Sequence, residues 1–121
     1  MTDRPLQGKT AFVSGSGRNI GRAVAVGLAR MGANVVINGA TRLSDCQETA
    51  RLVQAEGAQS LVVMGDMAQK ATIEAIRDQA LAQFGAVDIV VNNAAIRPHK
   101  PFLDMSDADW HSVVDTGLTA A

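Results

Sequence analysis

A glycine-rich turn directly between an apolar run and an amphipathic segment constrains this chain more than any other feature. The run over residues 10–14 ends in Gly15-Ser16-Gly17-Arg18-Asn19-Ile20-Gly21, and the helical pattern begins at once. Glycines let the backbone approach a ligand closely, and the first N–H groups of a helix carry the positive end of its dipole. The arrangement strand, turn and helix is therefore typical of a phosphate-binding site.

The spacing of the glycines fits one dinucleotide-binding pattern and fails another. The pattern G-x-G-x-x-G requires glycine where the chain has Ile20. The pattern T-G-x-x-x-G-x-G fits Ser14, Gly15 and Gly21, with Ser14 in place of threonine and Asn19 at the middle glycine position. Asparagine tolerates the left-handed backbone region better than most residues. A tight turn in any doubly wound protein can also carry several glycines, so the turn alone leaves both interpretations open.

Apolar runs alternate with helical periodicity along the whole chain. The pattern predicts strands at 9–14, 34–38, 59–64 and 87–91, and helices after the turn, over 44–56, up to Phe84 and from Ser106 onward. This alternation predicts an open, parallel, doubly wound α/β sheet of the Rossmann type, with helices on both faces. The first helix is predicted to pack through one stripe of apolar residues: Ile20, Ala23, Val24, Gly27, Leu28 and Met31.

Capping signals and proline positions predict the ends of several elements. Ser44 with Gln47 has the spacing of a capping box, and Ser106 with Asp109 begins the last helix. Trp110 is interpreted as a residue that anchors this helix in the core. The prolines between 96 and 101 predict an exposed loop, in which His99 and Lys100 are expected to be solvated.

The bulk properties exclude several classes of function. With 121 residues the chain has the length of one domain, so residues 1–121 are expected to form a single, partial domain. Eleven basic and 12 acidic residues give a net charge of −1. This balance lacks the excess of basic residues that is typical of nucleic-acid-binding proteins. A lone cysteine, Cys46, excludes an internal disulfide. Without a membrane-length apolar run or a signal-peptide core at the start, the expected location is the cytoplasm.

Several motifs in order make the chain similar to the short-chain dehydrogenase/reductase family. The turn resembles the cofactor turn of the family, Asp66 its adenine contact, and Asn92-Asn93-Ala94-Ala95 its N-N-A-G motif. The resemblance implies the strand order 3-2-1-4 and a nicotinamide dinucleotide bound at the carboxyl ends of the first and fourth strands. Asn92 is also open to a structural interpretation, as a tie between neighbouring strands. The implied cofactor-binding residues are Gly15, Ser16, Gly17, Arg18, Asn19, Ile20, Gly21, Ala40, Arg42, Asp66, Met67, Asn93, Ala94 and Ala95.

The end of the second strand favours NADP(H) over NAD(H). An acid there would bind the adenine ribose and repel a 2′-phosphate, but the chain continues Gly39-Ala40-Thr41-Arg42, without a carboxylate. Arg18 and Arg42 could bracket the 2′-phosphate through charge-assisted hydrogen bonds. Alternatively, Arg42 is a solvated residue of the next helix and only Arg18 matters.

The catalytic residues that the resemblance implies cannot be assigned. The family uses a Tyr-x-x-x-Lys pair, and the chain has no tyrosine. Gly117 stands where the family has a catalytic asparagine, so no residue is assigned to catalysis or to a metal, and the chain alone is expected to be inactive. It is interpreted as the N-terminal cofactor-binding half of a classical-type oxidoreductase that acts on a carbonyl or alcohol substrate. The alternative is a non-catalytic nucleotide-binding or interaction module, which the departures at Asn19, Ala95 and Gly117 favour.

The predicted sheet has consequences for association. Without further strands beside the fourth, we expect an unpaired edge and an uncovered apolar helix face around Val113, Val114 and Leu118. Self-association, or pairing with a complementary chain, is therefore expected. Neither nucleic acid nor a membrane is an expected partner.

Overall fold

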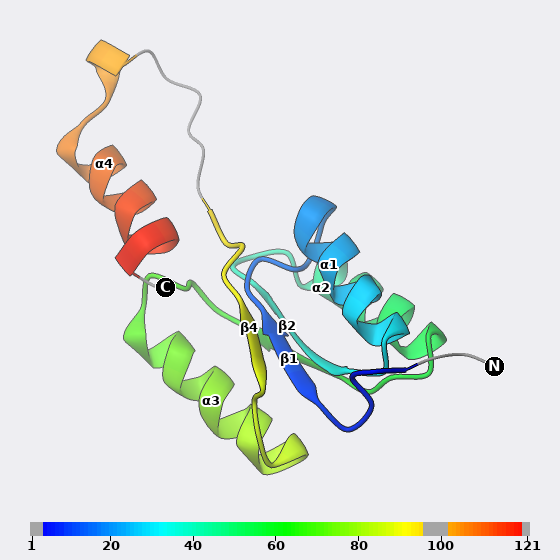
Figure 1. Cartoon of the computed structure of the whole chain (residues 1–121). Coiled ribbons are helices and arrows are strands. Elements are labelled where there is room, and N and C mark those ends of the chain that lie inside the picture. Colours follow the sequence, from blue (N-terminus) through cyan, green and yellow to red (C-terminus); the bar gives the residue numbers. More distant parts are fainter. Residues whose placement is uncertain (1–3, 96–101, 120–121) are drawn as a thin grey trace.

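The computed structural model describes residues 4–95 and 102–119, and within them four strands alternate with four α-helices (Figure 1). The elements are β1 (Thr10–Val13), α1 (Asn19–Arg30), β2 (Asn34–Gly39), α2 (Leu43–Ala55), β3 (Ser60–Met64), α3 (Lys70–Phe84), β4 (Ile89–Val91), the 3-10 turn η1 (Phe102–Asp104), α4 (Asp107–Val114) and the π-helical turn η2 (Asp115–Thr119). The predicted alternation of strands and helices is confirmed.

The four strands form one parallel sheet in the order β3-β2-β1-β4. Val13, at the end of β1, lies opposite Ile37 of β2 on one side and Val91 of β4 on the other. The carboxyl ends of the strands therefore share one edge of the sheet. This is the Rossmann-type architecture and the strand order that the sequence predicted, and the order reverses between β1 and β4.

Helices cover the two faces of the sheet unequally (Figure 1). Helices α1 and α2 pack on one face, here called the α1–α2 face, over Val13, Val35 and Ile37. Helix α3 packs on the other, the α3 face, over Phe12 and Val36. Successive side chains of a strand point to opposite faces, which is why neighbouring residues of β1 and β2 belong to different cores.

Helix α1 packs chiefly through small residues, and only part of the predicted apolar stripe, Val24 and Leu28, packs against the core. Its buried positions are Gly21, Ala25 and Ala29, whereas Ile20 is 65% exposed and Ala23 and Met31 are also exposed. The prediction ranked residues by hydrophobicity alone. Small side chains let the helix axis approach the sheet closely, which turns the bulkier residues to the margin of the contact.

Two further predictions about local structure need correction. Helix α2 begins at Leu43 after the N-cap Arg42, which makes no side-chain capping bond, so the capping box predicted at Ser44 is wrong. The last strand is shorter than predicted and starts at Ile89. The predicted loop over 96–101, including His99 and Lys100, lies outside the described residues.

The last helix follows its predicted start but not its predicted packing. The Ser106 hydroxyl accepts a hydrogen bond from the Asp109 N–H, and the Asp109 carboxylate accepts one from the Ser106 N–H, each at 3.0 Å. This reciprocal pair is the predicted capping box. Trp110, however, is 60% exposed, so its predicted role as a core anchor is wrong for the described part of the chain.

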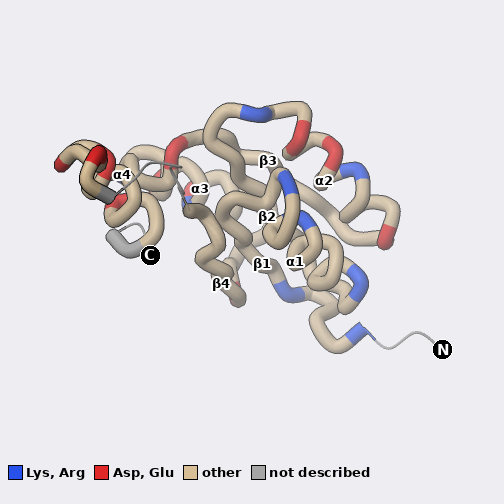
Figure 2. The backbone as a smooth tube through the Cα atoms, turned by 90° about the horizontal axis from the view of Figure 1, so that it is seen from above, with Lys and Arg blue, Asp and Glu red and all other residues tan. Residues whose placement is uncertain are grey.

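Charges are distributed unevenly over the backbone (Figure 2). Acidic and basic residues mix along α2, whereas the charged residues of the described segment around α4 are acidic: Asp104, Asp107, Asp109 and Asp115. The described segment around α4 therefore presents negative charge, whereas α2 presents charges of both signs. None of the helices in the described ranges combines the length and apolar character needed to cross a membrane.

Candidate cofactor-binding cleft

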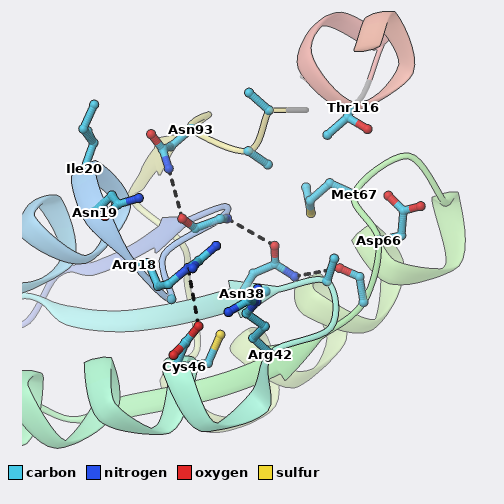
Figure 3. Close-up of a pocket in the computed structure, with 18 residues that line it drawn as sticks. Arg18, Asn19, Ile20, Asn38, Arg42, Cys46, Asp66, Met67, Asn93 and Thr116 are labelled. Carbon is cyan, nitrogen blue, oxygen red and sulfur yellow. Dashed lines mark hydrogen bonds and ion pairs between the residues drawn. The ribbon is translucent and has the colours of Figure 1, made fainter. Parts of the chain in front are cut away.

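A cleft of about 400 Å³ opens at the carboxyl edge of the sheet (Figure 3). Most of the predicted cofactor-binding residues line it: Gly15, Gly17, Arg18, Asn19, Ile20, Ala40, Arg42, Asp66, Met67, Asn93, Ala94 and Ala95. Residues that the sequence did not assign also line it: Asn38, Gly39, Asp45, Cys46, Gly65 and Thr116. Its size lies within the range of small-molecule and cofactor sites, which is about 300–1,000 Å³.

The glycine turn has the geometry that its sequence predicted. Gly15 and Asn19 both adopt left-handed backbone conformations, with φ of 61° and 55°. Asn19 thus takes at the middle glycine position a conformation that glycine adopts easily. A Cβ atom on Gly21 would lie 2.2 Å from the Gly15 carbonyl oxygen, so no larger residue fits there. Gly21 therefore shapes the turn from behind and does not line the cleft.

Hydrogen bonds join the ends of β1 and β4 beneath the cleft. The Ser14 hydroxyl oxygen accepts from the backbone N–H groups of Asn93 and Ala94 at 2.9 and 3.0 Å. The Asn93 amide in turn donates to the Gly15 carbonyl at 3.0 Å (Figure 3). The sequence left open a tie between neighbouring strands through Asn92; in the structure this tie comes from Asn93, while Asn92 is exposed.

A second set of bonds fixes the turn to β2 and β3. The Asn38 side chain accepts from the Gly15 N–H at 3.3 Å and donates to the carbonyls of Val63 and Gly65 at 3.1 and 3.2 Å. Ser16 is fully buried, and its hydroxyl donates to the Val13 carbonyl at 2.7 Å. Ser16 was predicted to bind cofactor, but it does not line the cleft and supports the turn.

The start of α1 suits an anion. Its N-cap, Arg18, makes no side-chain capping bond, and its first turn holds no acidic residue. The first N–H groups of a helix have no partner within the helix, so a phosphate can accept from them and gains from the helix dipole. Gly15 and Gly17 let the turn pack tightly, because a Cβ there would lie only 3.0 Å from Ala94 and 3.1 Å from Cys46. These features fit the pyrophosphate of a dinucleotide.

The end of the cleft nearest α2 holds both cations and an acid. Arg18 and Arg42 line it as predicted, but so does Asp45, whose Oδ2 lies 3.4 Å from Nε of Arg18 (Figure 3). The expectation that no carboxylate is available here is therefore wrong. The prediction considered only the end of β2, whereas Asp45 comes from the first turn of α2.

Cys46 lies next to this acid and is almost completely buried. Burial raises the pKa of its thiol, the charge of Asp45 raises it further, and Arg22 lowers it. A thiol with a raised pKa is a poor nucleophile at neutral pH, so Cys46 acts here as a small packing residue.

The opposite wall is formed by the loop after β3 and by η2. Asp66 is exposed, and its Oδ1 accepts from the Ala68 N–H at 2.9 Å, while Met67 is buried beside it. Thr116 of η2 points toward the same space (Figure 3), and its Oγ1 has no hydrogen-bond partner among the described residues although the side chain is only 9% exposed. No sequence motif singled out Thr116, because its place depends on how η2 returns to the cleft.

Comparisons with known proteins agree with this architecture. The family model for short chain dehydrogenase matches residues 9–121. A hydroxyacyl-CoA dehydrogenase of Mycobacterium tuberculosis is 39% identical over 93% of this chain and 37% of its own length. Glucose 1-dehydrogenase 2 of Bacillus subtilis is 35% identical over 96% of this chain and 45% of its own.

Solved structures show the same likeness. A short-chain dehydrogenase/reductase mutant from Serratia marcescens is 32% identical with a TM-score of 0.89, covering 96% of this chain and 47% of that one. A short chain dehydrogenase from Mycobacterium paratuberculosis, solved bound to NAD, is 27% identical with a TM-score of 0.88, over 96% of this chain and 47% of its own. The chain belongs to the short-chain dehydrogenase/reductase family of NAD(P)-dependent oxidoreductases. It spans less than half the length of these relatives.

Proposed function

We propose that this chain is the NADP(H)-binding part of an oxidoreductase that transfers hydride between the nicotinamide and a carbonyl or alcohol substrate. One observation carries the proposal: the uncapped start of α1 and the glycine turn face a cleft at the point where the strand order reverses. Family membership supports a nicotinamide cofactor. When bound, the cofactor would supply a hydride to a carbonyl substrate or accept one from an alcohol.

The lining residues divide into three proposed roles. The turn and the first N–H groups of α1 bind the pyrophosphate. Asp66 and Met67 recognise the adenine edge through a carboxylate and a backbone N–H, and the Thr116 hydroxyl, which has no hydrogen-bond partner among the described residues, can add a bond. Arg18 and Arg42 bind the 2′-phosphate, which is the basis for preferring NADP(H).

We propose no catalytic proton donor among residues 1–121 and no metal ligand. Proton transfer and substrate binding are assigned to residues outside this range, on the same or a complementary polypeptide, because the relatives are more than twice as long as the region they share with this chain. Residues 1–121 then form one partial dinucleotide-binding domain. A lone, buried Cys46 agrees with a reducing compartment such as the cytoplasm.

Fluorescence titration of the intact protein with NADPH and NADH tests the proposal. We expect NADPH to bind more tightly, and Arg18→Gln to weaken NADPH about tenfold while leaving NADH nearly unchanged, since it removes one charge-assisted contact. Arg30→Gln is the control, because Arg30 lies in the last turn of α1 and pairs with Glu56 at 2.9 Å. Equal affinities for both cofactors would contradict the NADP(H) preference.

The same protein preparation separates the two candidate functions. Reduction of a carbonyl panel with NADPH by the intact protein supports the oxidoreductase. Binding of NADPH without turnover supports the alternative, a non-catalytic nucleotide-binding module. Asn19 no longer favours that alternative, because it adopts the left-handed conformation within an intact turn.

A further inference from the structure

The acid in the cofactor cleft is held in place by the same elements that shape the phosphate turn. Arg22 of α1 donates from Nη2 to the carbonyls of Gly17 and Asp45 at 2.7 and 3.0 Å, and from Nε to the Thr49 hydroxyl at 3.0 Å. Thr49 donates to the Ser16 carbonyl at 2.8 Å. The first turn of α2 is therefore bonded to the glycine turn, and Asp45 cannot move away from it independently.

Arg18 and Asp45 form an ion pair through one oxygen of the Asp45 carboxylate, Oδ2, and this carboxylate is partly shielded from solvent. Nε of Arg18 lies 3.4 Å from Oδ2, and the Asp45 side chain is 28% exposed. Among the described residues, no group hydrogen-bonds to Oδ2, which is itself shielded from solvent. Arg18 is thus the partner that compensates this oxygen.

A 2′-phosphate would compete with Asp45 for Arg18. If Arg18 turns to the phosphate, Oδ2 stays shielded without a cation, and a shielded, uncompensated charge is unfavourable. The phosphate would also lie near the carboxylate, and like charges at short range repel. NAD(H) has a ribose hydroxyl at this position, so it needs neither the release of Arg18 nor the approach of two negative groups.

We propose that Asp45 is a specificity-determining residue that limits the preference of this cleft for NADP(H) over NAD(H). The proposal rests on the proposed function, since it takes the cleft to bind a nicotinamide dinucleotide with the 2′ position near Arg18. Arg18 favours the phosphate, and Asp45 opposes it by pairing with Arg18. The chain therefore discriminates less strongly than its two arginines alone would.

Dissociation constants for NADPH and NADH, measured with the intact Asp45→Asn protein, test this role. We expect NADPH to bind about fivefold to tenfold more tightly while NADH changes less than about twofold, because one partly exposed charge has been removed. The gain should shrink at high salt, since the pair is partly screened there. Glu48→Gln is the matched control: it removes an acid from the same helix, but Glu48 pairs with Arg51 and does not line the cleft.

A double-mutant cycle separates competition from a general change in the site. In an Arg18→Gln background, Asp45→Asn should raise the NADPH affinity clearly less than it does in the unmodified protein, because the competition for Arg18 is gone and only the direct repulsion between Asp45 and the phosphate is relieved. Thermal midpoints of all variants are measured alongside, since Asp45 lies in the first turn of α2. A second variant, Asp45→Ser, provides the same readout if the Asn variant folds poorly.

Each outcome decides the matter. An NADPH-to-NADH preference that rises in Asp45→Asn but not in Glu48→Gln supports the proposal. An unchanged NADPH-to-NADH preference in Asp45→Asn overturns the proposal. A lower preference also overturns it, because it would show that Asp45 orients Arg18 for the phosphate. Failure of the unmodified protein to bind either dinucleotide overturns the proposed function itself, which is a different result.

Discussion

Ile37, in strand β2, and Ile73, in the helix that covers the other side of the sheet, are residues of the same type, yet their surroundings differ. Ile37 of β2 is completely buried on the α1–α2 face, in contact with a core that two helices close. Ile73 of α3 remains 38% exposed. The comparison shows that the fold completes one face from its own residues and leaves the other partly open.

The opening on the α3 face is an apolar groove of about 330 Å³. Exposed apolar side chains lie along it, among them Leu81 and Val90, the latter 58% exposed. Val90 belongs to β4, which pairs with β1 alone in the described sheet. The sequence placed the uncovered apolar surface on the last helix, but Val113 and Val114 there are half-buried, and Leu118 has no described side chain.

The largest expected difference between the faces concerns these two isoleucines. Ile37→Ala should lower the free energy of unfolding by about 3–5 kcal/mol, because it removes a buried side chain and leaves a cavity. Ile73→Ala should lower it by less than about 1.5 kcal/mol, because part of that side chain is already in water. Urea denaturation of the intact protein measures both. Equal losses would show that the α3 face is as well covered as the other.

Two glycines of α1 test how tightly the α1–α2 face closes beneath the cleft. Gly21→Ala should destabilise the protein by about 1–3 kcal/mol, since its Cβ would lie 2.2 Å from the Gly15 carbonyl. Gly27→Ala is the control in the same helix, because a Cβ there meets nothing within 4 Å. It should stabilise the protein by about 0.5–1 kcal/mol, as alanine is the better helix former. A destabilising Gly27→Ala would contradict this account of the packing.

Thiol labelling compares access to the two faces directly. Cys46 on the α1–α2 face should react with a thiol reagent at pH 8 at least about tenfold more slowly than free cysteine, because burial blocks access and raises its pKa. A raised pKa means less thiolate at a given pH, so labelling should accelerate only at higher pH. In a Cys46→Ala background, Leu81→Cys on the open face should react at nearly the free rate. Fast labelling of Cys46 in the native protein would show that α2 opens readily.

The smallest change in stability is expected at the exposed edge. Val90→Lys should alter the free energy of unfolding by less than about 0.5 kcal/mol, since the side chain is largely in water. It should nevertheless reduce self-association, because a charge on an edge strand opposes pairing with another chain. Sedimentation velocity over a concentration series measures this. The expected self-association would be contradicted by an unmodified protein that stays monodisperse and monomeric throughout.

Much of the fold could be predicted because its signals are local in sequence. The apolar runs, the glycine turn and the Ser106 capping box each depend on residues a few positions apart, and all are present. The buried side of α1 could not be predicted in the same way. Which residues face the sheet depends on how closely the helix can approach it. The small side chains of Ala25 and Ala29 allow the close approach and are therefore the ones that are buried.

The residues of the candidate site also divide into those that local sequence predicted and those that only the packing of distant elements brings to the cleft. From the sequence came the turn, Arg18, Arg42, Asp66 and the segment 93–95, because each follows directly on a strand and the carboxyl ends of parallel strands meet at one edge. Asp45 and Thr116 were missed, because they come from α2 and η2, and only the packing of those elements brings them to the cleft.

The sequence by itself determined that a dinucleotide-type turn opens an α/β sheet of this family. Tertiary structure alone decided what surrounds that turn. The bonds from Arg22 and Thr49 place the carboxylate of Asp45 beside Arg18. On the other face, α3 leaves the groove beside β4 open within the described part of the chain. The physical reason is that backbone conformation follows from neighbouring residues, whereas charge pairing and burial depend on distances between elements far apart along the chain.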